Sequence, residues 1–124
     1  MQAAKQAFLN SILKQGEYYA GIILGKDGEP DYHLILLPGE AESVNWRDAN
    51  EFSEKAGGEL PTRREQSLLY TNLKEQFQSL YYWSGEQHVA FSGPAWCQGF
   101  GYGYQDYYGK SAELRARAVR RSVI

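Results

Sequence analysis

The chain has 124 residues, the usual length of one domain, and its single cysteine excludes an intramolecular disulfide and a four-cysteine zinc site. A formal net charge of -2 argues against broad nucleic-acid binding, because that activity requires a surplus of cations. The first apolar runs are too short for a membrane span and do not have the form of a signal peptide. We therefore expect a cytoplasmic protein that makes no membrane contact.

The first segment of the chain, residues 3–14, has the periodicity of an amphipathic helix. Its apolar residues fall on one helical face: Phe8, Leu9, Ile12 and Leu13. We expect this helix to occupy residues 1–15, with a single domain over residues 16–124. The helix either packs on its own domain or contacts a second copy of the chain in a homo-oligomer.

A β-hairpin is predicted next, from two apolar strands at residues 18–25 and 32–37. Between them, Asp27 and Gly28 supply the positive φ angles that tight hairpin turns require. His33 opens the second strand, and we expect it to be a partly buried structural residue.

Two further helices follow, and each carries a capping signal. The first is expected from residue 46 to about residue 56, with Asn45 as its N-cap. The second is expected from residue 62 to about residue 77, where Thr62 and Glu65 form a capping box. Because that box uses the amides at the helix start, Arg63 and Arg64 are expected to lie on a solvated turn rather than at a phosphate site.

After residue 80 the periodicity changes from helical to alternating. Residues 81–84 and 95–100 read as strands, and residues 114–118 as a half-buried strand. Phe100, Tyr102 and Tyr104 alternate with glycines, which in an extended chain would place the rings on one face. The three tryptophans are expected in the core: Trp46, Trp83 and Trp96.

Several of these segments together resemble a known family. The matching pieces are Trp-Arg-Asp-Ala at 46–49, Gly-Gly-Glu-Leu-Pro-Thr-Arg-Arg-Glu at 57–65, Tyr-Trp-Ser at 82–84, Trp96, and Arg-Ala-Val-Arg at 117–120. They are similar to a bacterial and bacteriophage family of unknown function with the C-type-lectin-like fold of the formylglycine-generating enzymes. Residues 16–25 and 33–39 look like its prophage-encoded branch, so the resemblance covers roughly residues 16–121.

The resemblance implies an α+β fold in which two helices pack on a small twisted antiparallel sheet and the N- and C-terminal strands pair. The predicted N-terminal helix is additional to this fold. In relatives of the family, the strands and loops before the last strand contact the target. In this sequence that region corresponds to about residues 83–110.

This region contains the residues that we expect to bind a partner. They are Tyr102, Tyr104, Gln105, Asp106, Tyr107 and Tyr108, with Gln87 and His88 alongside. Tyrosine offers a large contact area and a hydroxyl at low entropic cost, so the expected partner is a protein, with a glycan as the alternative. In a competing interpretation, Phe100, Tyr102 and Tyr104 form a packed structural face.

A secondary basic patch is a further candidate. It consists of Arg115, Arg117, Arg120 and Arg121. Two interpretations remain open: a solvated strand face with salt bridges, or a contact for an acidic partner or a nucleic-acid phosphate.

No cofactor, metal or catalytic group is expected. Formylglycine-generating enzymes bind copper through a cysteine pair, whereas Cys97 stands alone and is expected to be a buried apolar residue. The signatures of calcium-dependent sugar binding are absent. A hydrolase with a cleft near Trp83, His88 and Arg117 remains the alternative from another class, although no nucleophile-elbow pattern surrounds a serine.

The sequence thus favours a non-enzymatic binding module encoded by a phage or prophage. We expect it to act inside the cell on a host system such as a defence complex. The alternative is a receptor-binding protein of the virion.

Overall fold

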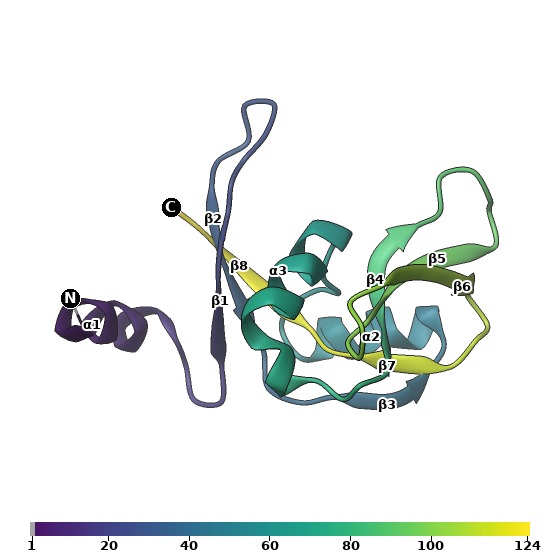
Figure 1. The fold of residues 1–124 in the computed structure, drawn as a ribbon, viewed down its shortest axis with the longest axis horizontal. Helices are drawn as coiled ribbons and strands as arrows, with labels where there is room; N and C mark the ends of the chain where they lie inside the picture. The colour runs from purple at the N-terminus through teal and green to yellow at the C-terminus, as the bar shows by residue number, and fades with distance from the viewer. Residues whose placement is uncertain (1) are drawn as a thin grey trace.

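The computed structural model describes residues 2–124, which form a mixed α+β structure (Figure 1). Its helices are α1 (Gln2–Ile12), α2 (Trp46–Lys55), α3 (Arg63–Leu73) and the short 3-10 helix η1 (Lys74–Gln76). Its strands are β1 (Tyr18–Ile23), β2 (Tyr32–Leu36), β3 (Ala41–Val44), β4 (Tyr81–Gln87), β5 (Pro94–Gly99), β6 (Gln105–Gly109), β7 (Leu114–Ala116) and β8 (Val119–Val123).

The strands form two sheets, not the one small antiparallel sheet that the resemblance implies. One sheet has the order β1-β2-β8 and the other β3-β7-β4-β5-β6. All pairs are antiparallel except β4 with β7, which run parallel. Helix α3 lies between the three-stranded sheet and strands β4 and β5 (Figure 1), so it links the two halves of the molecule.

Each half has its own apolar core. The first lies between α3 and the three-stranded sheet, with Leu34, Leu36 and Leu69 fully buried. The second lies between α2 and the larger sheet around Trp83, which is also fully buried. The prediction of a core tryptophan is therefore confirmed at this position.

The predicted hairpin is confirmed as β1 and β2. Asp27 and Gly28 have φ angles of 55° and 85°, as the turn chemistry requires. His33 is partly buried and hydrogen-bonded to Tyr19 at 2.8 Å, which confirms its structural position.

Both helix caps are also confirmed. Asn45 accepts the amide of Asp48 at 2.8 Å, and Thr62 and Glu65 form the reciprocal capping box. Helix α3 ends earlier than expected, because the chain tightens into η1 and leaves Phe77 extended.

Helix α1 lies at the side of the three-stranded sheet and buries none of its residues (Figure 1). Phe8 touches the rings of Tyr19 and His33. Arg120 donates to the carbonyl of Ile12 at 2.7 Å, which holds the C-terminal end of the helix.

The predicted strand at 114–118 is wrong in one respect, because β7 and β8 are separate strands in different sheets. The chain passes from the five-stranded sheet to the three-stranded sheet at Arg117, whose buried guanidinium donates to the carbonyls of Gln76 and Leu37. Strand β3 was not predicted, since its four residues include no buried side chain.

The prediction of an extended run through Phe100, Tyr102 and Tyr104 is also wrong. Residues 100–103 form a turn between β5 and β6, closed by hydrogen bonds between Gly99 and both Gly103 and Tyr104. Gly103 takes a φ of 84°, which favours glycine. The rings therefore separate: Phe100 enters the core, whereas Tyr102 and Tyr104 are 88% and 70% exposed.

Candidate binding surface

Most of the predicted binding residues lie on or beside β6, which is an edge strand of the five-stranded sheet. Side chains of a strand point alternately to its two faces. Tyr107 therefore faces Trp96 on one side, with ring centroids 5.3 Å apart. Tyr108 faces Tyr81 on the other side, at 5.6 Å. The structure thus divides the predicted site into two surfaces.

We call the first surface the aromatic cluster, defined by His88, Phe91, Trp96 and Tyr107. The His88 ring stacks on Trp96 with centroids 4.9 Å apart and also meets Tyr107 at 4.5 Å. The Phe91 ring is exposed, and its centroid lies 4.9 Å from that of the His88 ring. The cluster is therefore a continuous aromatic surface open to solvent.

Arg63 joins this cluster from the start of α3. Its guanidinium lies 3.6 Å from the centroid of the Trp96 ring. Its Nε donates to Gln105 Oε1 at 3.0 Å, and Gln105 Nε2 donates to the Arg63 carbonyl at 2.8 Å. Gln105 therefore holds the Arg63 side chain in place, and its own side-chain amide is engaged in these two bonds.

We call the second surface the tyrosine hollow, a cavity of about 570 Å³ on the opposite face of β6. Its lining residues are Ser79, Leu80, Tyr81, Gly99, Gly101, Tyr102 and Tyr104. The lining is mostly apolar, and Leu80 is itself exposed. The exposed rings of Tyr102 and Tyr104 thus border a concave site.

Trp96 is the member of the aromatic cluster that the sequence predicts to lie in the core. Trp96 is only partly buried and belongs to neither core, so the core prediction is wrong for it, whereas the partly buried Trp46 packs against the second core. The indole N–H groups of Trp46 and Trp83 donate to the carbonyls of Ser84 and Val44. Trp96 makes no such bond within residues 2–124, so its indole N–H is available to a partner.

Two predicted binding residues instead support local structure. The Asp106 carboxylate accepts the amide of Tyr107 at 2.8 Å, which occupies a donor on the open edge of β6. Gln87 accepts a hydrogen bond from Lys110, and the Lys110 ammonium also donates to the Ser92 carbonyl. Their side chains therefore hold the edge strand and the β4–β5 connection in place.

The predicted basic patch does not exist as a free cationic surface. Arg115 pairs with Glu40, and Arg120 pairs with Glu17 at 2.8 Å. Arg121 pairs with both Glu59 and Glu65. Arg117 is buried and donates to backbone carbonyls. All four arginines therefore have partners within the protein, which favours the interpretation as a strand face with salt bridges.

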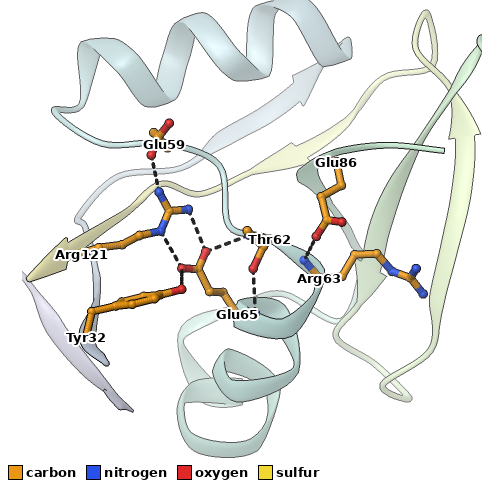
Figure 2. A network of polar contacts seen from close by, with 7 residues as sticks. All are labelled: Tyr32, Glu59, Thr62, Arg63, Glu65, Glu86 and Arg121. Carbon is orange, nitrogen blue, oxygen red and sulfur yellow. Dashed lines mark hydrogen bonds and ion pairs between the residues drawn. The ribbon is translucent and has the colours of Figure 1, made fainter. Parts of the chain in front are cut away.

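Figure 2 shows the strongest of these pairs, around the fully buried Glu65. Arg121 donates to both carboxylate oxygens at 2.6 and 2.9 Å, and Tyr32 donates its hydroxyl. Burial alone would raise the pKa of Glu65, but the bonds from Arg121, Tyr32 and the Thr62 amide hold that pKa below its ordinary value. The network ties α3 to β2 and β8.

The amides at the start of α3 are occupied by carboxylates. Glu65 accepts from the Thr62 amide, and Glu86 accepts from the Arg63 amide at 2.6 Å (Figure 2). A phosphate at this helix start would have to displace both groups. The expected solvated turn is found for the exposed Arg64 but is wrong for Arg63, which packs on Trp96.

Cys97 is fully buried in β5, as predicted, and burial raises the pKa of its thiol to about 12. The three groups proposed for a hydrolytic cleft have separate partners. Trp83 donates to Val44 in the core, Arg117 donates to Gln76 and Leu37, and His88 stacks on Trp96. The structure therefore does not bring them into one site.

No protein-family model and no curated protein matches this chain. Within residues 2–124, none of the helices combines the length and apolar character needed to span a membrane. The same residues contain no group of three or more His, Cys, Asp or Glu side chains placed to hold a metal ion.

Proposed function

We propose that this protein is a non-enzymatic binding module that recognises a protein partner through the aromatic cluster and the tyrosine hollow. The observation that carries the proposal is the collection of exposed rings on both faces of one edge strand. Tyrosine, tryptophan and arginine are the residues that contribute most energy at the centres of protein interfaces. These residue types meet here around β6.

The polar ends of these side chains support a recognition role. Tyr32 and Tyr82, which belong to the interior, donate their hydroxyls to Glu65 and Glu40. By contrast, the hydroxyls of Tyr102, Tyr104 and Tyr107 have no hydrogen-bond partner within residues 2–124. An exposed ring with a free hydroxyl is suited to a partner that offers both apolar area and polar groups.

The C-type-lectin-like family remains part of the proposal. It is supported by two helices packed on the sheets and by the position of the surface before the closing strands, although the C-terminal β8 pairs with β2 and not, as expected, with the first strand β1. On this basis we favour a prophage-encoded protein that acts on a host system inside the cell. A virion receptor-binding protein would use the same surface, and mass spectrometry of purified particles distinguishes the two roles.

The experiment is quantitative affinity capture from bacterial host lysate with substitutions on each surface. Tyr107→Ala removes a ring of the aromatic cluster, and Tyr104→Ala removes one from the tyrosine hollow. The matched control is Tyr18→Ala on β1, because Tyr18 and Tyr107 are 42% and 41% exposed. We expect all three variants to stay folded and the two surface variants to lose at least tenfold in partner recovery. Equal recovery by all proteins would refute the proposed surface.

A further inference from the structure

We propose that Arg63 makes the aromatic cluster selective for a protein segment that carries a carboxylate side chain beside an aromatic one. The inference rests on the proposed binding function and adds the chemistry of the partner. It depends on how the guanidinium is held and on which of its nitrogens are free.

The guanidinium of Arg63 is fixed before any partner arrives. It lies on the Trp96 ring at 3.6 Å, and its Nε is bound to Gln105. Gln105 in turn donates to the Arg63 carbonyl, so one side chain holds both ends of the residue. Less side-chain entropy is therefore lost when the guanidinium binds a ligand.

The two terminal nitrogens of Arg63 have no hydrogen-bond or ion-pair partner within residues 2–124. In this respect Arg63 differs from Arg115, Arg120 and Arg121, which pair with carboxylates. Arg47 makes only long contacts from its Nε, but it is 86% exposed and nothing holds it in one orientation. Arg63 is therefore an oriented cation with an unused hydrogen-bonding edge. Figure 2 shows its side chain pointing away from the Glu65 network.

Arg63 is also one of the residues that line a cavity of about 590 Å³. The other lining residues are Tyr32, Thr62, Arg64, Ser67, Glu86 and Gln105. A guanidinium with two parallel N–H groups matches the two oxygens of a carboxylate. The cavity gives such a carboxylate room beside the arginine.

The surrounding charges favour one carboxylate over a polyanion. Glu86 accepts the Arg63 amide and so places a negative charge at the same end of α3. The whole chain also has a net charge of -2. A run of phosphates would meet these charges, whereas a single carboxylate needs only the one guanidinium. A neutral glycan would leave that guanidinium unpaired.

The aromatic part of the partner follows from the neighbouring rings. Phe91 and Tyr107 are exposed, so a second aromatic ring can contact them, and the Trp96 indole N–H has no acceptor within residues 2–124. A peptide carbonyl next to that ring would satisfy the indole N–H. The segment that fits therefore combines a carboxylate for Arg63 with a ring for the cluster.

The test uses acetylated, amidated eight-residue peptides in a Gly-Ser background, each with one Glu and one Phe separated by zero to three residues. Matched peptides carry Gln in place of Glu. Binding is followed by the nitrogen–proton NMR signals of the three indoles in the full chain. We expect a saturable shift of the Trp96 signal with at least one Glu peptide, and at least tenfold weaker binding of its Gln counterpart.

Arg63→Lys keeps the charge but removes the paired N–H edge, and we expect it to weaken binding of the Glu peptide at least fivefold. Arg47→Lys is the matched control and should bind as the wild type does. The proposal is overturned if no Glu peptide shifts Trp96, if Glu and Gln peptides bind equally, or if Arg63→Lys has no effect. It is also overturned if inorganic phosphate, an oligonucleotide or glucuronic acid binds Arg63 more tightly than the peptides.

The peptide results separate this inference from the proposed function. Equal binding of Glu and Gln peptides at Trp96 would remove the carboxylate selectivity and leave the aromatic surface as a binding site. Undiminished lysate capture by the Tyr107→Ala and Tyr104→Ala proteins would remove the surface itself.

Discussion

Replacing Glu65 by Gln tests the buried network that ties α3 to the three-stranded sheet. The carboxylate is surrounded by donors. Oε1 accepts from the Thr62 amide and from Arg121, and Oε2 accepts from Tyr32 and from Arg121. A carboxamide has one oxygen and one NH2 group. In either orientation its NH2 group faces an N–H donor of Arg121.

The expected cost follows from this mismatch and from the lost charge. Removing one member of a buried ion pair costs about 3–5 kcal/mol, because the other charge stays behind without compensation. The Arg121 side chain keeps its pair with Glu59 and is 27% exposed. We therefore expect Glu65→Gln to lower the free energy of unfolding by about 3 kcal/mol, the lower end of this range. Gln still serves in a capping box, so the helix start contributes little to the loss.

Equilibrium denaturation by urea measures this change. The matched control is Glu59→Gln, which removes the other carboxylate on the same arginine but one that is 71% exposed. Exposed pairs contribute at most about 1 kcal/mol, so the control should change little. A loss below about 1 kcal/mol for Glu65→Gln, or equal losses for both variants, would refute the reasoning.

The same variant has a predicted pH dependence. The pKa of Glu65 is lowered from 4.5 in the folded state, so its stabilisation is complete above that pH and is lost as the pH falls through the folded pKa. We therefore expect the stability of Glu65→Gln to fall less than that of wild type below pH 4.5. Parallel stability profiles in this range would contradict the assignment.

Three further outcomes follow from the structure. Burial raises the pKa of the Cys97 thiol to about 12, so Cys97 should resist a thiol reagent at pH 8 until urea unfolds the protein. Rapid reaction of the folded protein would contradict its burial. Gly103→Ala should lower the free energy of unfolding, measured with urea, by about 2 kcal/mol, and Gly28→Ala by about 1 kcal/mol. Both glycines have a positive φ, but only a Cβ at Gly103 would lie 2.9 Å from a tyrosine ring. Trp83→Ala should cost about 3–5 kcal/mol and Trp96→Ala about 1–2, since only the first is fully buried, and equal costs would place Trp96 in the core.

The features that the sequence predicted correctly are local ones. The caps at Asn45 and Thr62 and the turn at Asp27 and Gly28 depend on groups within three residues of each other, so the sequence contains all of the information. The buried position of Cys97 follows from its small apolar side chain in a strand. Each of these predictions needs no knowledge of what the chain packs against.

The candidate surface could be predicted in part only. The sequence indicates residues 83–110, but the division of their rings between two faces depends on the turn at 100–103 and on the register of β5 with β6. Arg63 is 33 residues from Trp96 in sequence, so no local pattern joins them. One signal was present for Trp96: it alternates with Ala95 and Cys97, and small buried neighbours on both sides predict that it points outward.

The same limit explains the arginines near the C-terminus. Their carboxylate partners are distant in sequence, since Arg115 pairs with Glu40 and Arg120 with Glu17. A cluster of cations in the sequence is a basic surface only if no carboxylates fold against it. Here the fold supplies those carboxylates, and Arg63, whose guanidinium pairs with no carboxylate within residues 2–124, lies elsewhere.

The most direct test of the binding surface is the comparison of the Tyr107→Ala and Tyr18→Ala proteins in quantitative capture from host lysate. Both remove one partly exposed tyrosine from a strand, so they differ mainly in location. The account predicts that the same partner is recovered by the wild type and by Tyr18→Ala, and at least tenfold less by Tyr107→Ala. Equal recovery by all three, with unchanged melting temperatures, would contradict it.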